Sequence, residues 1–312
     1  MNEQEKFDWM VYVSCMTFNQ ASYIEDAMNG FTMQKTDFPF VCAIVDDAST
    51  DGEQEVIKNY LNEHFDLEDK NIVRHEETDD FILTYARNKT NMTCYFAVLY
   101  LKYNHYKKKP KLPYLARWRD NAKYMAICEG DDYWIDSHKL QRQTDLFRNN
   151  PEMTYCFSNR KVHNEITGRD RIDRYSNRKY TQKDFLSGFN PGLQTVMLEI
   201  ELIKNVDYAL YKGVNGDRLY PYLCTREGYA LCLQEETAVY RFSPIGVSSS
   251  VALRSTPSAY FKHACDDFYR FHESTGYPYK KGYMKASANY AIRYLVQHND
   301  FNLSLFYEMT SR

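Results

Sequence analysis

Apolar runs and amphipathic segments alternate along the N-terminal quarter of the chain. Residues 11–16 and 40–45 are apolar over a length typical of buried strands, and residues 72–73 predict a third, shorter strand. Helices are predicted at 22–34 and 50–61, because each segment begins with the Ser/Thr and Glu spacing of a reciprocal helix cap. This βαβαβ order is typical of a parallel sheet that binds ligands at the carboxyl ends of its strands.

The rest of the chain predicts a mixed α/β body. The expected elements are a helix at 92–106, a strand at 124–128, a helix capped by Asp136 that ends at Asn149, a strand at 153–158, a helix starting at Thr181 and a strand at 195–200. Beyond Leu253 the pattern becomes helical and aromatic, without a clear linker. We therefore expect an α/β domain at residues 1–250 and a C-terminal helical extension at 251–312.

Charge argues against one broad class of function. The chain has 39 Lys and Arg against 42 Asp and Glu, so it lacks the basic excess that nucleic-acid binding normally needs. A basic segment between Lys102 and Lys123 is the exception, with Asp120 as its single acid. Its basic residues are Lys102, Lys107, Lys108, Lys109, Lys111, Arg117, Arg119 and Lys123. This segment fits either a solvated loop or contact with a phosphate or an anionic membrane surface.

The eight cysteines do not have the spacing of metal ligands. There is no Cys-x-x-Cys pair, and Cys15, Cys42, Cys128 and Cys156 fall inside apolar runs, where they are expected to be small core residues. The polar N-terminus lacks the features of a signal peptide, and no run approaches the ~18 apolar residues that cross a bilayer. We expect a cytoplasmic protein, with peripheral contact at the inner face of the membrane left open.

Two acidic pairs follow predicted strands. Asp46-Asp47 ends the second strand, and Asp131-Asp132 follows the strand at 124–128. Because the carboxyl ends of parallel strands share one edge, both pairs are expected to meet there. Crowded carboxylates repel each other unless a cation compensates, and such oxygen ligands suit Mg²⁺ or Mn²⁺. Taken singly, each pair also fits a turn or a helix cap.

Three segments resemble the motifs of one enzyme family in their order and spacing. They are Thr17-Phe18-Asn19, Val45-Asp46-Asp47-Ala48-Ser49-Thr50-Asp51-Gly52 and Glu129-Gly130-Asp131-Asp132-Tyr133-Trp134. With them the chain resembles the family 2 glycosyltransferases of the GT-A fold, over about residues 10–250. The resemblance implies an α/β fold of the nucleotide-diphospho-sugar transferase type, with a Rossmann-like mixed sheet, and a nucleotide-sugar donor.

The resemblance also implies a donor site at the first two motifs. Thr17 and Asn19 would line the pocket for the base and the ribose. Asp47 would contact the nucleotide base, with Asp46 beside it.

The third motif would bind the diphosphate end of the donor. Asp131 would lie near the ribose and the metal, and Asp132 would be a ligand of the Mn²⁺ or Mg²⁺ that bridges the two phosphates. Glu129 stands where the family usually has Asp, so its part in donor binding is left open.

A catalytic base is implied further along the chain. Asp217, in the segment Gly216-Asp217-Arg218-Leu219-Tyr220, matches the family's base, and an inverting transferase needs a single such carboxylate. As an alternative, Asp217 is a turn residue after Asn215-Gly216. Arg241 lies in a segment that resembles the part closing over the donor, where it fits a phosphate contact or a solvent salt bridge.

The sequence therefore predicts a metal-dependent inverting glycosyltransferase of cell-envelope, capsule or lipopolysaccharide synthesis. Its partners would be a nucleotide-sugar, with UDP as the expected nucleotide, and a glycan or lipid-linked glycan acceptor. A sugar nucleotidyltransferase would need a Gly-rich phosphate loop after the first strand, which residues 17–20 do not provide. A non-catalytic binding protein of this fold would not need the complete acidic set. The C-terminal aromatic segments fit packing on the main domain, a homodimer contact or a membrane contact.

Overall fold

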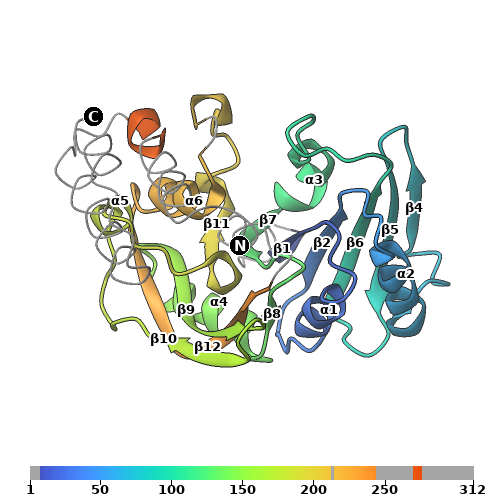
Figure 1. The fold of residues 1–312 in the computed structure, drawn as a ribbon, viewed down its shortest axis with the longest axis horizontal. Coiled ribbons are helices and arrows are strands. Elements are labelled where there is room, and N and C mark those ends of the chain that lie inside the picture. The colour runs from blue at the N-terminus through green and yellow to red at the C-terminus, as the bar shows by residue number, and fades with distance from the viewer. Residues whose placement is uncertain (1–7, 212–213, 244–269, 276–312) are drawn as a thin grey trace.

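A mixed sheet with helices on both faces forms the described part of the chain, residues 8–211, 214–243 and 270–275 of the computed structural model (Figure 1). The strands are β1 (Trp9–Thr17), β2 (Phe40–Asp46), β3 (Phe65–Asp66), β4 (Arg74–Glu77), β5 (Phe81–Asn88), β6 (Cys94–Leu101), β7 (Ala122–Ile127), β8 (Tyr133–Trp134), β9 (Met153–Asn164), β10 (Arg169–Asp173), β11 (Met197–Glu199) and β12 (Tyr229–Phe242). The helices are α1 (Ile24–Thr32), α2 (Glu53–His64), α3 (Leu112–Arg119), α4 (Lys139–Asn149), α5 (Gln182–Leu186) and α6 (Gly216–Cys224).

The strand order within the described residues is β3-β5-β6-β2-β1-β7-β11-β9-β12-β8, with β10 paired to β9 and β4 paired to β5. Strands β6, β2, β1 and β7 are parallel neighbours, and β2 is buried along its whole length. Strands covered on both faces read as continuous apolar runs, which is why the sequence identified β1 and β2. The predicted α/β class with a mixed sheet is confirmed.

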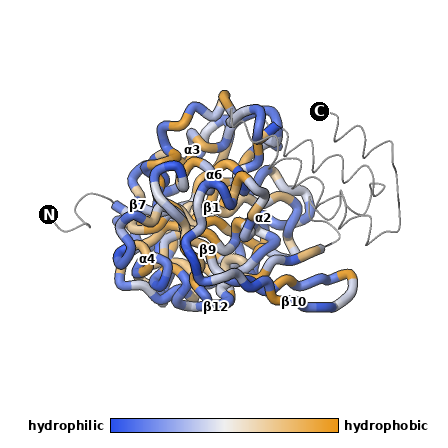
Figure 2. Tube along the Cα trace, turned by 90° about the vertical axis from the view of Figure 1, so that its left-hand side faces the viewer, coloured by the Kyte–Doolittle hydropathy of each residue, from blue (hydrophilic) through white to orange (hydrophobic). Residues whose placement is uncertain are grey.

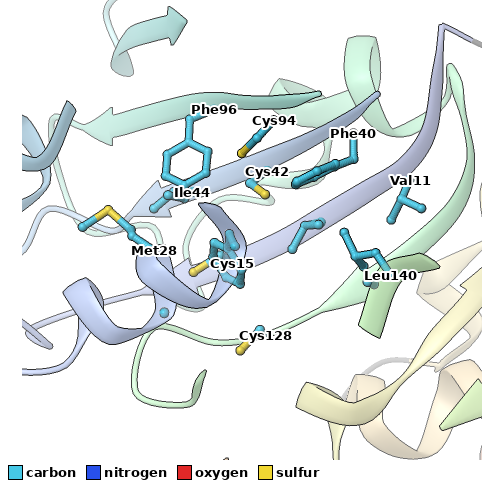
Figure 3. Packing of buried hydrophobic residues seen from close by; sticks show 14 of the residues in the cluster. Val11, Cys15, Met28, Phe40, Cys42, Ile44, Cys94, Phe96, Cys128 and Leu140 are labelled. Atoms are coloured by element: carbon cyan, nitrogen blue, oxygen red, sulfur yellow. The ribbon is translucent and has the colours of Figure 1, made fainter. Parts of the chain in front are cut away.

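Two hydrophobic clusters cover the two faces of this sheet. One contains the buried sides of α1, α2 and α4, and the other contains those of α3, α5 and α6. Cys15, Cys42, Cys94 and Cys128 lie among the apolar side chains of the first cluster (Figure 3). The described cysteines are all buried free thiols, so the prediction of core cysteines is confirmed.

The helix predicted at 92–106 is wrong, because this segment forms β6. Strand β6 lies between β2 and β5 and is buried at nearly every position. A run buried on both faces has no useful periodicity, so it can be mistaken for a helix. The strand predicted at 72–73 is also wrong, since the chain turns there and β4 begins at Arg74.

The helix starts differ from the predicted caps. Helix α1 begins after Tyr23 without a side-chain cap, so Ser22 is not the capping residue. Helix α2 begins after Gly52, whose φ of 94° favours glycine, and Asp51 accepts the Glu53 N–H at 3.1 Å in place of Thr50. The predicted start at Thr181 is confirmed, since its capping box with Asp184 is formed.

Three further segments refine the predictions. Helix α4 begins at Lys139, and Asp136 accepts the His138 N–H instead of capping the helix directly. Strand β9 continues to Asn164, well past the predicted end, while only Met197–Glu199 of the predicted strand at 195–200 is extended. The boundary at residue 250 lies outside the described residues, and so does the predicted extension at 251–312 apart from the helical residues 270–275.

Candidate active site

The carboxyl ends of three parallel strands bring the sequence motifs to one edge of the sheet. Thr17 at the end of β1 pairs with Asp46 at the end of β2. Beyond the end of β7, the Gly130 N–H donates to the Met16 carbonyl at 3.1 Å. A Cβ on Gly130 would lie 2.3 Å from the Thr17 hydroxyl, so the loop after β7 passes this point only as glycine. The structure thus places both acidic pairs at the predicted edge.

A buried carboxylate joins the loops after β1 and β2. Glu53, at the start of α2, accepts hydrogen bonds from the Thr17 hydroxyl, the Gln20 N–H at 3.0 Å and the Ser49 hydroxyl at 2.7 Å. Burial raises the pKa of Glu53. The Thr17 side chain is therefore engaged inside the protein, and Glu53, which the sequence indicated only as a helix cap, shapes the site.

Asn19 holds the same two loops together. Its backbone has a φ of 54°, a conformation that Asn tolerates better than most residues. Its N–H donates to the Ser49 hydroxyl at 2.9 Å, and its side-chain oxygen accepts the Thr50 N–H at 2.8 Å. These contacts leave the neighbouring Phe18 ring 45% exposed at the edge of the sheet.

Asp46 is fully buried. Its Oδ1 accepts from the Gln54 amide at 2.6 Å and from the Ser49 N–H at 3.2 Å, while its Oδ2 has no hydrogen-bond partner in the described structure. Burial, and then the charge of Asp46, raise the pKa of Tyr100, its neighbour on β6. Asp46 is therefore placed to hold Ser49 and Gln54 from inside the protein, without contact with solvent.

Asp47 is bound by the basic segment. Its Oδ1 accepts the His105 N–H at 2.6 Å, and its Oδ2 accepts from Lys111 Nζ at 2.7 Å. Lys111 immediately precedes α3, so the basic segment reaches back over the end of β2. Sequence analysis named Lys111 within this segment but did not identify its contact with Asp47, because the two residues lie 111 − 47 = 64 positions apart in the chain.

Other basic side chains of this segment lie away from the site. Several of its side chains pair with surface carboxylates: Lys102 with Glu77, Lys109 with Asp80, Arg117 with Glu76 and Arg119 with Asp120. Such exposed pairs stabilise a fold by at most about 1 kcal/mol each. Lys111 is the member of this segment that reaches the site.

The second acidic motif is crowded. Asp132 is 6% exposed, and its Oδ1 accepts the Arg241 N–H at 2.8 Å. Asp131 is half-buried. Burial raises the pKa of both carboxyl groups, and the charge of Asp131 adds to the effect on Asp132. Two such groups side by side are stabilised in their charged form by a cation.

Glu129 links this motif to the predicted base. Desolvation by surrounding atoms, followed by the charges of Asp131 and Asp217, raises the pKa of Glu129 to about 7, while Lys111 acts in the opposite direction. The residue itself is exposed to solvent. Glu129 and Asp131 lie in the loop after β7, Lys111 precedes α3 and Asp217 lies in α6, so these four charged residues come from three separate segments of the chain.

Asp217 lies in the first turn of α6, where the helix dipole favours a negative charge. Its Oδ2 accepts a hydrogen bond from the Asn190 amide at 2.7 Å, while its Oδ1 has no partner among the described residues. Asn190 is a further residue that sequence analysis missed, and no motif around it signals the contact. Asp217 therefore lies within a helix and not in the turn given as the alternative, while its role as a base stays a prediction.

Arg241, on β12, joins the second acidic motif to α1. Its guanidinium is 7% exposed, donates to Asp26 at 2.6 Å and lies 3.4 Å from Glu165. The rings of Tyr23 and Tyr133 flank it, 4.5 and 4.8 Å from ring centroid to Cζ. The salt bridge foreseen as an alternative therefore forms, but with a guanidinium that is shielded from solvent.

Lys139→Met is expected to stabilise the protein by about 2 kcal/mol at pH 7. The Lys139 ammonium is fully buried, donates to Gln143 at 2.6 Å and has its pKa lowered to about 8 by burial. Charging it in the folded state costs about 3 kcal/mol, and the lost hydrogen bond returns about 1 kcal/mol. Because the unfolded chain binds this proton more tightly, wild-type stability should rise towards that of the variant between pH 8 and 10.5.

Urea unfolding at pH 7 and pH 10 checks this prediction. Lys58→Met, which removes the same charge from an exposed position on α2, serves as the control and should change stability little. Equal stability of wild type and Lys139→Met at pH 7 would contradict it.

The fit of a divalent metal depends on the second acidic motif. Within the described ranges, no group of three or more His, Cys, Asp or Glu side chains is arranged to hold a metal ion alone. Mg²⁺ and Mn²⁺ sites that bind nucleotides need only one or two carboxylates, because water and phosphate oxygens complete the shell. The crowded Asp131 and Asp132 fit such an open site.

Comparison with known proteins finds a family to which part of the chain is similar. Residues 13–92 match the model of the family described as Glycosyl transferase family 2. Rv1520, an uncharacterised protein of Mycobacterium tuberculosis, is 31% identical over 147 residues, which are 46% of this chain and 32% of that protein. The match thus spans about a third of this curated relative.

Solved structures give the same fold. Staphylococcus aureus TarS in complex with UDP-GlcNAc has a TM-score of 0.56 and 16% identity, over 92% of this chain and 72% of that one. TarS in complex with UDP has a TM-score of 0.53 and 14% identity over the same shares. At these identities the likeness establishes the fold alone.

A mixed sheet covered by helices on both faces, with acidic motifs at the carboxyl ends of β2 and β7, defines a GT-A fold. Residues 13–92 of this chain are in addition similar to the family 2 glycosyltransferases. No helix of the described residues is long and apolar enough to cross a bilayer.

Proposed function

We propose that the protein is a metal-dependent inverting glycosyltransferase that moves a sugar from a UDP-sugar to a glycan or lipid-linked glycan in cell-envelope, capsule or lipopolysaccharide synthesis. The observation that carries this proposal is the meeting of the second acidic motif with Asp217 beside the end of β2. The charges of Asp131 and Asp217 both act on Glu129, so these groups lie within electrostatic reach of one another. A fold alone would not require that arrangement.

The nucleotide would bind beside the first acidic pair. The Phe18 ring is exposed at the sheet edge and offers a flat face on which a base can stack. Asp47 accepts hydrogen bonds, so it suits the imide N–H of uracil once Lys111 has moved aside. TarS, which has the same fold, has been crystallised with UDP, and this supports the choice of nucleotide.

Transfer would use the side chains of five residues of this chain. Asp131 and Asp132 would hold Mn²⁺ or Mg²⁺, which supplies positive charge beside the diphosphate leaving group when bound. Asp217 takes the proton from the acceptor hydroxyl, whose oxygen then attacks the anomeric carbon as the bond to the diphosphate breaks. The Asn190 amide holds one oxygen of Asp217, so the other oxygen remains to receive the proton. Arg241 adds positive charge on the diphosphate side, acting on Asp131.

We place the reaction in the cytoplasm. The described cysteines are all free thiols, which supports a reducing compartment. An acceptor at the inner face of the membrane would require peripheral contact with the lipid surface, and a homodimer is compatible with this arrangement.

The test is calorimetric titration of UDP into the purified full chain, with and without Mn²⁺. We expect binding in the micromolar to millimolar range that strengthens at least about tenfold with Mn²⁺. UMP should lose most of the Mn²⁺ effect because it lacks the second phosphate, and GDP tests the choice of base. If wild type binds UDP under neither condition, the proposed donor is wrong.

A further inference from the structure

One face of the β9–β10 hairpin carries three arginines beside the proposed active site. Strand β10 pairs antiparallel with the end of β9, and the hairpin projects from the body of the molecule (Figure 2). Asp173 lies opposite Arg160 and Arg171 lies opposite Val162. Side chains alternate along a strand, and opposite residues share a face. Arg160, Arg169 and Arg171 therefore share one face, here called the arginine face.

Arg160 is the inner end of the arginine face. Its Nη1 lies so near Gly192 that a Cβ on Gly192 would come within 2.0 Å of it. The Gly192 N–H donates to Asn190 at 3.0 Å, and the Asn190 amide donates to Asp217 at 2.7 Å. The charge of Arg160 also reaches Asp132, where it acts against the effect of burial. Arg160 thus lies against the loop that holds the proposed base, and its charge reaches the second acidic motif.

Two of the arginines use only their Nε atom for hydrogen bonds to other described residues. Arg160 and Arg171 both donate to Asp173 through Nε, at 2.9 and 3.0 Å. Their Nη1 and Nη2 atoms have no hydrogen-bond partner among the described residues. The Arg171 side chain is 67% exposed and that of Arg160 is 15% exposed, so this pair reaches from solvent towards the site. A planar fork of this kind binds carboxylate or phosphate oxygens in pairs.

Aromatic and charge features of the same face match a sugar acid. Arg160 lies 5.3 Å from the centroid of the half-buried Tyr240 ring, on the neighbouring strand β12. Aromatic faces pack well against the apolar side of a sugar ring. The face carries three arginines and one aspartate, Asp173, which leaves a charge of 3 − 1 = +2, although the whole chain has a net charge of −3.

We propose that the arginine face binds the acidic groups of an anionic glycan, so that the acceptor of this transferase carries carboxylates or phosphates near the hydroxyl that reacts. This inference rests on the proposed function, because Asp217 marks where the acceptor hydroxyl must lie. Charged side chains on an edge strand also prevent sheet-to-sheet pairing. That protective role requires charge of either sign, whereas acceptor binding requires the guanidinium groups themselves.

The test compares a fluorescent oligogalacturonide, which has one carboxylate per sugar, with the same oligosaccharide after methyl esterification. Each is titrated by anisotropy into the full chain, with and without UDP and Mn²⁺. Wild type should bind the acidic form at least about tenfold more tightly than the ester. Arg160→Gln/Arg171→Gln should abolish this preference. Arg169→Gln/Arg171→Gln, which keeps the Arg160 contact with Asp173, should weaken it.

Three controls separate the possible causes. Lys107→Gln/Lys108→Gln removes two positive charges from the basic segment and should preserve the preference. UDP affinity without Mn²⁺ should be unchanged in both arginine variants, and Arg160→Lys should lose most of the preference although it keeps the charge.

Four results would overturn the inference. They are equal binding of acid and ester by a wild type that binds UDP, equal loss in the lysine variant, reduced UDP affinity without Mn²⁺ in the arginine variants, and binding to phosphatidylglycerol vesicles that depends on the arginines while glycan binding does not. Failure of wild type to bind UDP would instead count against the proposed function.

Discussion

Asp217→Asn is expected to reduce sugar transfer by about 10²- to 10⁴-fold, the range typical of losing a general base. Asparagine has nearly the same shape, and its carbonyl oxygen can still accept the hydrogen bond that Asn190 donates at 2.7 Å. The variant therefore loses the ability to take a proton and little else. Since Asp217 is assigned to the acceptor, the affinity for UDP with Mn²⁺ should stay within about twofold of wild type.

The measurement is the initial rate of UDP release from the UDP-sugar that wild type turns over, with UDP titration on the same samples. Asp207→Asn is the matched control, because it removes the same charge from an exposed turn that precedes α6. Activity within tenfold of wild type in Asp217→Asn would remove Asp217 as the base. A parallel loss of UDP binding would move it to the donor site.

The central strands could be predicted because each is an apolar run that ends in a polar turn. Strands β1 and β2 follow this rule, and their motifs then fall at one edge of the sheet for topological reasons. Strand β6 follows it as well, but its length allowed a helix, and only its pairing with β2 and β5 decides between the two. The hydrophobic pattern within one segment could thus not identify an element whose structure depends on its pairing with other strands.

The residues of the site likewise fall into two sets, those that the sequence identifies and those that only the folded chain brings together. The acidic pairs could be found because their residues are consecutive in sequence, and consecutive residues keep their spacing in any fold. Lys111 on Asp47 and Asn190 on Asp217 join segments that only the folded chain brings together. Glu53 was visible in the sequence but misread, because a Glu three residues after Thr50 has the spacing of a cap, while in the structure its carboxylate serves Thr17 and Ser49.

The arginines show why charge patterns need a structure. Along the sequence, Arg160 and Arg171 are two basic residues in a mixed stretch of polar residues. The hairpin register alone puts them on one face, with Asp173 between them. The basic segment gave a stronger signal in sequence, yet most of its paired side chains bind surface carboxylates.

Asp132→Asn is expected to abolish the Mn²⁺-dependent part of UDP binding, a loss of at least about tenfold in affinity. Asparagine can still accept the Arg241 N–H, which Asp132 Oδ1 accepts at 2.8 Å, so the loop after β7 should keep its shape. What is lost is the negative charge, and a neutral amide is a much poorer ligand for Mn²⁺ or Mg²⁺. UDP binding without metal should change little.

Thermal stability distinguishes the loss of a metal ligand from misfolding. The loss of the carboxylate should raise the Tm of the metal-free protein, whereas misfolding would lower it. Burial raises the pKa of Asp132, so the folded state binds the proton more tightly than the unfolded chain, and wild-type stability falls as pH rises above about 3.8. Removing the carboxylate should therefore raise the Tm of the metal-free protein at pH 7.5, and the gain should disappear towards pH 4. A variant that binds no metal and is also less stable at pH 7.5 would show that Asp132 supports the fold and does not bind the metal.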